Sequence, residues 1–264
     1  MKFKFGFIGC GNMGGALIKA ISKAVDCASI AVCDKDENKA NAFANELGVN
    51  AVDSITLAKQ SEFIVLGVKP QVVENAVSEI SSALAENENA TIISMCAGVT
   101  SELIKKLSKV SACIRIMPNT PASVGEGIIL YAPNGVPQES EEEFRKYFSS
   151  AGLVVKIDEE KMDKHTAITG CGPAFVYMFI DAMKKSAVSI GIDEADAEKF
   201  CAQTVLGSAK MVLAFGNADQ LKINVCSPGG STIEGVKSLE KDDLYSVVDR
   251  AVQASKKRTE EMKK

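Results

Sequence analysis

The N-terminal residues constrain the fold of this chain more than any other stretch of its sequence. Residues 3–8 form a short apolar run that is typical of a buried strand, and an apolar-periodic segment at residues 13–21 predicts a helix. Gly9, Gly11 and Gly14 therefore lie in a turn between a strand and a helix. In that context a GxGxxG turn presents free N–H groups to the pyrophosphate of a dinucleotide. A purely structural glycine turn is the alternative.

The composition is that of an ordinary soluble globular protein. The chain has 264 residues, of which 46% are hydrophobic, and this length allows one large domain or two smaller ones. A net charge of −4, an aromatic content of 6% and the lack of tryptophan argue against nucleic-acid binding. We expect no signal peptide and no membrane-spanning segment, because the chain enters a strand at once and no apolar run is long enough.

Eight cysteines are scattered along the chain, and no two of them form a CxxC pair. We expect free thiols that pack as small hydrophobic side chains in a reducing compartment, the cytoplasm. His165 is the only histidine, so we expect no metal site built on several histidines. We interpret His165 as a surface or interface residue.

Strands and helices alternate through the first part of the chain. Further strands are predicted at residues 29–33, 63–68, 91–95, 112–117, 127–131 and 153–157, with helices at 40–47, 72–84 and 139–148. Another helix begins near Ser101, which is the expected N-cap. The alternation predicts an α/β fold with a doubly wound, mainly parallel sheet.

Strand-like runs disappear after residue 158, and long helical patterns take over. Helices are predicted at residues 172–190, 195–215, 230–239 and 244–262. We therefore predict a dinucleotide-binding domain at residues 1–158 and an all-helical domain at residues 159–264. Because such broadly apolar helices cannot bury all their faces within one chain, we expect the second domain to pack against a second copy, which gives at least a homodimer.

Three loops follow predicted strands at the edge where ligands bind in open α/β sheets, and they comprise residues 9–14, 67–70 and 95–98. Lys69 in the second loop is a candidate contact for a phosphate or a ribose hydroxyl. After the second strand, Asp34 falls where a carboxylate accepts a hydrogen bond from the ribose 2′-OH of NAD. The adjacent Lys35 favours the 2′-phosphate of NADP instead, so the choice between NAD and NADP stays open.

Residues 224–232 form a second candidate binding site. Small polar residues and glycines precede a helical pattern here, and they supply N–H groups and hydroxyls at the positive end of a helix dipole. Such a loop suits a carboxylate, and Thr232 offers one neutral donor. Simple helix capping is the alternative.

Several motifs resemble those of the pyrroline-5-carboxylate reductases. They are the glycine turn at residues 6–14, the stretches at 68–70, 96–100, 117–121 and 170–174, and Pro228-Gly229-Gly230-Ser231-Thr232 within residues 225–232. The resemblance implies a Rossmann-type first domain, a helical dimerisation domain and often a ring of dimers. It also implies an oxidoreductase that reduces 1-pyrroline-5-carboxylate with NADPH or NADH, in the last step of proline biosynthesis.

The resemblance assigns residues to both ligands. For the cofactor we take Ile8, Gly9, Cys10, Gly11, Asn12, Met13, Lys69, Pro70 and Ala97, with the neighbouring Val68 and Cys96, and Asp34 and Lys35 at the end of the second strand. The substrate contacts fall on Asn224, Ser227, Gly230, Ser231 and Thr232. Asp34 departs from the family pattern, which usually has a residue compatible with the 2′-phosphate. Cys171 and Cys226 stand where serine is common.

The implied reaction needs few catalytic groups. A protonated cyclic imine accepts hydride readily, so the enzyme mainly holds C4 of the nicotinamide against the imine carbon. Thr232 is the candidate catalytic residue, because its hydroxyl can bond the ring nitrogen while the loop amides hold the carboxylate. Two alternatives are a relative of the β-hydroxyacid dehydrogenases with Lys210 or Lys222 as the catalytic lysine, and a dinucleotide sensor without turnover.

Overall fold

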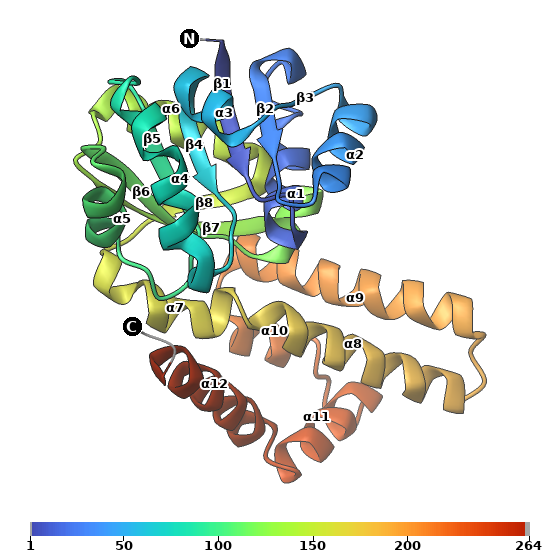
Figure 1. The fold of residues 1–264 in the computed structure, drawn as a ribbon. Coiled ribbons are helices and arrows are strands. Elements are labelled where there is room, and N and C mark those ends of the chain that lie inside the picture. Colours follow the sequence, from blue (N-terminus) through green and yellow to red (C-terminus); the bar gives the residue numbers. More distant parts are fainter. Residues whose placement is uncertain (1, 262–264) are drawn as a thin grey trace. The chain divides into compact units, whose positions relative to one another are not determined.

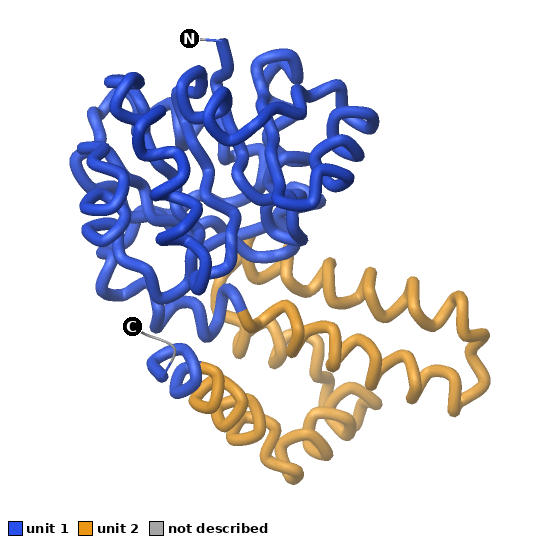
Figure 2. Tube along the Cα trace, viewed as in Figure 1, with its two compact units in different colours: residues 1–170, 256–264 blue, residues 171–255 orange. Residues whose placement is uncertain are grey.

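The computed structural model describes residues 2–261, and the chain divides into two compact units. The first unit comprises residues 1–170 and 256–264, and the second comprises residues 171–255 (Figure 2). The first unit contains the sheet, whereas the second is helical (Figure 1).

The first unit is built on an eight-stranded sheet in the order β3-β2-β1-β4-β5-β6-β7-β8. The strands are β1 (Phe3–Ile8), β2 (Ile30–Cys33), β3 (Asn50–Ala51), β4 (Ser61–Leu66), β5 (Thr91–Ser94), β6 (Ala112–Met117), β7 (Gly127–Asn134) and β8 (Gly152–Lys156). Neighbouring strands are parallel except for β6 and β7, which are antiparallel. The prediction of a doubly wound, mainly parallel sheet is confirmed, although the two-residue β3 was too short to show a pattern.

Helices cover the sheet and bury its two faces in separate clusters. They are α1 (Asn12–Ile21), α2 (Glu37–Leu47), α3 (Ser54–Gln60), α4 (Val73–Ala85), α5 (Ser101–Ser108), α6 (Gln138–Phe148) and α7 (Met162–Thr169). Strand β4 shows the alternation: Phe63 and Val65 join a cluster with α1 and α6, whereas Ile64 and Leu66 join one with α3, α4 and α5. Because these four side chains are fully buried, each stabilises the fold by roughly 1.5–3 kcal/mol.

The prediction that Ser101 caps its helix was wrong. Thr100 is the N-cap of α5, and its side chain accepts a hydrogen bond from the Leu103 N–H at 3.2 Å. Ser101 is the first helical residue and is fully buried. Its N–H and hydroxyl donate to the Glu159 carboxylate at 2.8 Å and 2.5 Å. Because Glu159 lies far from Ser101 in the sequence, no local sequence pattern could predict this contact.

Polar contacts attach α7 to the sheet of the first unit. Arg115 on β6 is buried and pairs with Asp163 at 2.9 Å and with Glu159 at 3.4 Å. At the other end of the helix, the Asn119 amide donates to the Thr169 carbonyl at 2.9 Å. The first compact unit accordingly extends to Gly170, although the composition changes near residue 158.

The second unit is helical, as predicted, but one chain buries little of it. Its helices are α8 (Gly172–Ser189), α9 (Glu194–Phe215), α10 (Ala218–Asn224), α11 (Ser231–Lys241) and α12 (Leu244–Glu261), whose last turns belong to the first unit. Among its described residues only Ala197 and Cys201 are buried hydrophobic residues. Large side chains such as Met178, Leu213 and Phe215 are exposed instead.

Among residues 2–261, one helical run, Glu159–Ser189, is by length and composition long and apolar enough to span a membrane. The most apolar 18-residue window of this run has a mean hydropathy of 1.2, and 6% of that window is buried. On this criterion the prediction that no run is long enough was wrong. Length and composition do not distinguish a helix that faces lipid from one that is covered by protein.

All eight cysteines are free thiols, as predicted. Burial raises the pKa of Cys10, Cys33 and Cys113 to about 12. These three side chains are therefore neutral near pH 7 and behave as small hydrophobic groups.

Candidate active site

The loops that follow β1, β2, β4 and β5 lie next to one another at one edge of the sheet. The Gly9 N–H donates to the Cys33 carbonyl, and the Gly67 N–H donates to the Ile8 carbonyl, both at 2.8 Å. The loop after β5 is bonded to the end of β4 in the same way. The strand order reverses at β1, which has β2 on one side and β4 on the other. The predicted cofactor loops thus meet at the switch point where such sheets bind ligands.

The glycines of the first turn divide into two kinds. Gly9 has a φ of +104°, and a Cβ at this position would lie 2.6 Å from the Gly67 carbonyl oxygen. A Cβ on Gly14 would lie 2.1 Å from the Gly9 carbonyl oxygen. A Cβ on Gly11, by contrast, would meet no atom within 4 Å. The packing of the turn therefore requires Gly9 and Gly14, whereas Gly11 leaves the backbone open to a ligand.

Helix α1 begins without a side-chain cap. Its N-cap is Gly11, and its first turn has no acidic residue. Helices α2, α3 and α5 differ, because Asp36, Asp53 and Thr100 accept hydrogen bonds from their first N–H groups. The N–H groups at the start of α1 are thus available to an anion.

Asp34 is held against the glycine turn. Its Oδ2 accepts a hydrogen bond from the Cys10 N–H at 2.7 Å, and its Oδ1 accepts one from the Asp36 N–H at 2.9 Å. Sequence reasoning placed Asp34 near the cofactor but did not foresee the contact with Cys10. Lys35 is exposed and forms no ion pair within the described part of the chain.

A second helix in the chain also begins at a glycine. Helix α11 has Gly230 as its N-cap, with no side-chain cap, and Gly229 before it has a φ of +72°. The Gly230 N–H donates to the Ser227 carbonyl at 3.0 Å, which closes a tight turn. Ser231 and Thr232 are exposed in the first helical turn. No described side chain accepts a hydrogen bond from the first N–H groups of α11, and its first turn includes one acidic residue, Glu234.

Comparison with known proteins places both motifs in one family. A family model for pyrroline-5-carboxylate reductase dimerisation matches residues 159–262, and a model for coenzyme F420-dependent NADP oxidoreductases matches residues 4–98. The chain is 38% identical to the pyrroline-5-carboxylate reductase of Escherichia coli strain K12, over the whole of both proteins. This chain belongs to the pyrroline-5-carboxylate reductase family.

Solved structures agree with this membership. The pyrroline-5-carboxylate reductase of Coxiella burnetii matches with a TM-score of 0.89 at 31% identity, over all of both chains. The Plasmodium falciparum pyrroline carboxylate reductase, solved with NADP bound, matches with a TM-score of 0.86 at 31% identity, over 99% of this chain and 98% of that one. The Rossmann-type first unit and the helical second unit are therefore features shared with solved members of the family.

The remaining cofactor candidates offer a ligand either backbone atoms or exposed side chains. Cys96 is buried, and its thiol lies 3.4 Å from the Val68 carbonyl oxygen, so its side chain joins two cofactor loops. Ile8 and Cys10 are buried as well, which leaves only their backbone to a ligand. The candidates Asn12 and Lys69 are exposed, whereas Met13, Pro70 and Ala97 are partly exposed.

The substrate candidates all lie in the second unit, whereas the cofactor candidates lie in the first. Asn224 is the last residue of α10, not part of a loop as predicted, and its Oδ1 accepts a hydrogen bond from Gln220 at 3.0 Å. Ser227 and Cys226 lie in the turn that connects α10 to α11. Cys171 immediately precedes α8 and is partly exposed.

Lys222 and His165 form contacts within the chain that do not favour a catalytic role. Lys222 pairs with Asp219 at 3.0 Å and with Glu240 at 3.2 Å, and hydrogen bonds to these carboxylates raise its pKa. A lysine that holds its proton more tightly is a poor choice for the catalytic lysine of the β-hydroxyacid dehydrogenase alternative. His165 is exposed on α7, and its Nδ1 lies 2.8 Å from the Lys161 carbonyl oxygen.

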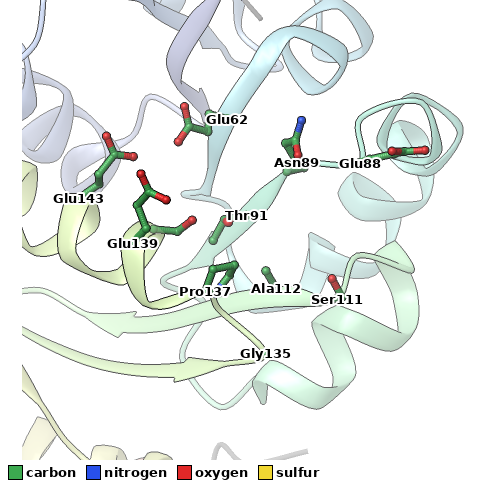
Figure 3. A pocket seen from close by; sticks show the side chains of 12 residues that line it. Glu62, Glu88, Asn89, Thr91, Ser111, Ala112, Gly135, Pro137, Glu139 and Glu143 are labelled. Atoms are coloured by element: carbon green, nitrogen blue, oxygen red, sulfur yellow. The ribbon is translucent and has the colours of Figure 1, made fainter.

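A pocket of about 380 Å³ lies away from these loops, near the starts of β5, β6 and α6 (Figure 3). Four glutamates contribute to its lining, and they are Glu62, Glu88, Glu139 and Glu143. Lys4 pairs with two of them, Glu62 at 2.8 Å and Glu143 at 2.6 Å. An acidic surface of this kind repels the phosphates of a dinucleotide, so this pocket is not the cofactor site.

Proposed function

We propose that this chain is an oxidoreductase that reduces 1-pyrroline-5-carboxylate to L-proline with NADPH or NADH, the last step of proline biosynthesis. Family membership over the full length supports the reaction, and NADP in the Plasmodium falciparum relative supports the cofactor. The observation that carries the proposal is the pair of glycine-capped helix starts, because each offers N–H groups that suit one anionic ligand.

The first unit supplies the cofactor site in this proposal. The N–H groups at the start of α1 bind the pyrophosphate, Asp34 and Lys35 face the adenosine ribose, and the loops at residues 68–70 and 96–97 complete the site. The space next to the Gly11 Cα is open, because a Cβ there would meet no atom within 4 Å. A pyrophosphate can therefore approach the backbone closely at Gly11. When bound, the reduced nicotinamide supplies a hydride.

The second unit supplies the substrate site. The N–H groups of Ser231 and Thr232 at the start of α11 hold the substrate carboxylate, with Asn224, Ser227 and Gly230 shaping the turn. The imine takes its proton from solvent, and the Thr232 hydroxyl oxygen accepts a hydrogen bond from the protonated ring nitrogen and so orients the ring. Hydride delivered to the imine carbon, with the proton already on nitrogen, would give the secondary amine of proline, whose carboxylate the N–H groups of α11 would still hold.

We also propose that the functional particle is a homodimer and that dimers associate into a ring. The dimerisation model at residues 159–262 supports oligomerisation. Exposed apolar residues on α8 and α9, such as Met178 and Leu213, would be covered by a second copy instead of lipid. We place the domain boundary at residues 158/159, where that family model begins, and the enzyme in the cytoplasm, which suits its eight free thiols.

A single assay tests the proposed reaction. Protein is mixed with pyrroline-5-carboxylate and either NADPH or NADH, and the loss of reduced-nicotinamide absorbance is followed. We expect loss that depends on the imine, with proline as the product. Cofactor binding without turnover would instead support the dinucleotide sensor. Turnover that Lys210→Ala abolishes would support the β-hydroxyacid dehydrogenase relative.

A further inference from the structure

We infer that Asp34 gives this chain a preference for NADH over NADPH, because its carboxylate accepts the 2′-hydroxyl of the adenosine ribose and repels a 2′-phosphate. The inference rests on the proposed function of the first unit as a dinucleotide site. It names the residue that distinguishes the two cofactors, which the family membership leaves open.

The position of Asp34 is fixed from the side of the glycine turn. It directly follows Cys33, the last residue of β2, and its Oδ2 accepts the Cys10 N–H at 2.7 Å. Because Cys10 lies between Gly9 and Gly11, the carboxylate is bonded to the same turn that binds the pyrophosphate. A carboxylate oxygen has more than one acceptor direction, so Asp34 can still bind a ribose hydroxyl.

Asp34 is also fixed from the side of α2. Its Oδ1 accepts the Asp36 N–H at 2.9 Å, so backbone groups hold both of its oxygens. A carboxylate with only one such bond could rotate away from a phosphate, but rotation of Asp34 breaks two hydrogen bonds. The cost of binding a 2′-phosphate is therefore charge repulsion or the loss of both contacts.

The nearest helix N-terminus does not offer a phosphate site in compensation. Helix α2 begins at Glu37, and the Asp36 side chain already accepts the Asn38 N–H at 3.2 Å. Asp36 and Glu37 thus occupy the positive end of the α2 dipole with negative charge. Residues 34–39 contain three carboxylates and two lysines, which leaves the turn with a net charge of −1.

Lys35 and Lys39 are the two groups in this turn that favour a phosphate. Lys39 lies 4.0 Å from Asp36, whereas Lys35 is exposed and has no ion pair within the described residues. A solvated lysine on a flexible stem contributes little to binding compared with a carboxylate held at two points. We therefore expect Lys35 to support residual use of NADPH and not to reverse the preference.

The test measures cofactor affinity directly. Isothermal titration calorimetry of NADH and NADPH, without substrate, gives two dissociation constants for the wild-type protein and for each variant. We expect the wild-type protein to bind NADH about tenfold more tightly or better, an effect typical of like charges held close together near a protein surface. Asp34→Asn keeps an acceptor for the Cys10 N–H. In this variant the ratio of the NADPH dissociation constant to the NADH dissociation constant should fall by about tenfold, because NADPH binds more tightly.

Two control variants separate the contributions. Glu46→Gln removes a carboxylate near the opposite end of α2, where it pairs with Lys19 at 2.7 Å, and it should leave the ratio of the two dissociation constants within about twofold of wild type. Lys35→Ala should weaken NADPH binding and leave NADH binding unchanged. Thermal unfolding of each variant shows whether it is folded.

The outcomes distinguish this inference from the proposed function. Equal or tighter binding of NADPH by the wild-type protein, or an unchanged ratio in Asp34→Asn, would overturn the role of Asp34. If neither dinucleotide binds, the site itself is wrong and both proposals fail. If NADH binds selectively but pyrroline-5-carboxylate is not reduced, the cofactor preference stands and the proposed reaction fails.

Discussion

The helices α1 and α11 both begin at a glycine, but α11 has an acidic residue, Glu234, in its first turn and the two helices are supported differently. Both have a glycine N-cap without a side-chain hydrogen bond. Helix α1 packs seven buried residues into the core of the sheet unit, whereas α11 has none. The turn before α1 is therefore shaped by the core beneath it. The turn before α11 is shaped only by its own local contacts, such as the bond from Gly230 to Ser227.

This difference in support matches the two tasks that we propose for the two turns, cofactor binding and substrate binding. A turn built into the core is complete in a single chain, and we propose that it binds the part of the cofactor that many redox enzymes share. The turn before α11 carries the hydroxyls and N–H groups that suit one small carboxylate, and it lies in a unit that exposes its apolar helices. We therefore expect dinucleotide binding to tolerate loss of assembly, whereas turnover should not.

Gly14→Ala should give the largest effect, because it attacks the supported turn. The new Cβ would lie 2.1 Å from the Gly9 carbonyl oxygen, and backbone cannot move away cheaply. We expect a loss of about 3 kcal/mol or more in the free energy of unfolding, together with loss of dinucleotide binding. Chemical denaturation and NADH titration measure the two effects. Gly11→Ala is the control, because it meets no atom within 4 Å and should fold normally.

Leu213→Glu should give the next largest effect, because it attacks the unsupported unit. Leu213 on α9 is 83% exposed in one chain, so a charge there costs little unless a second copy covers the site. We expect a monomer in light scattering and turnover that falls by more than tenfold, since a buried charge at an interface is strongly unfavourable. NADH binding should persist. A dimer with normal turnover would show that α9 does not form the interface.

Thr232→Ala should lower turnover by about 10- to 100-fold, the range expected when one hydrogen bond to a charged or reacting group is lost. Cofactor affinity should not change, because Thr232 lies in the other unit. Steady-state kinetics with both substrates measures this separation. Ser238→Ala removes another hydroxyl from α11 and should have no effect, and normal turnover in Thr232→Ala would remove Thr232 from the mechanism.

Asp53→Ala should give the smallest effect, on stability alone. Asp53 caps α3 and forms hydrogen bonds with Thr56. Its loss should lower the free energy of unfolding by about 1 kcal/mol at neutral pH, and the binding of cofactor and substrate should not change. The bonds to Thr56 lower the pKa of Asp53, so its stabilisation is present above its ordinary pKa and is lost as pH falls through the lowered value. Denaturation curves should therefore converge at acidic pH. A difference that persists when the carboxyl is protonated would contradict this account.

The sequence was most informative where contacts are local. The β1–turn–α1 unit and the glycine before α11 follow from residues within a few positions of one another, and both were predicted correctly. The contacts of Ser101 with Glu159 and of Asp34 with Cys10 join residues far apart in the chain, so no local pattern reveals them. The same holds for α7, whose ties to Arg115 and Asn119 attach it to the sheet unit although its composition matches the helices that follow.

We propose that N–H groups at the start of α11 hold the substrate carboxylate, and a proline substitution at the first helical residue removes one of these groups. Ser231 is the first helical residue after Gly230, a position where proline is well tolerated, so Ser231→Pro removes one N–H and keeps the helix. Ser231→Ala, which loses only the hydroxyl, is the matched control. The measurement is the ratio of kcat/KM for pyrroline-5-carboxylate to that for 1-pyrroline, which has no carboxylate.

We expect Ser231→Pro to lower this ratio by about tenfold or more, while Ser231→Ala changes it much less. Asn12→Pro, the same change at the start of α1, should weaken NADH binding and leave the ratio unchanged. An unaltered ratio in a folded Ser231→Pro variant would contradict the claim, because the carboxylate would then be held elsewhere.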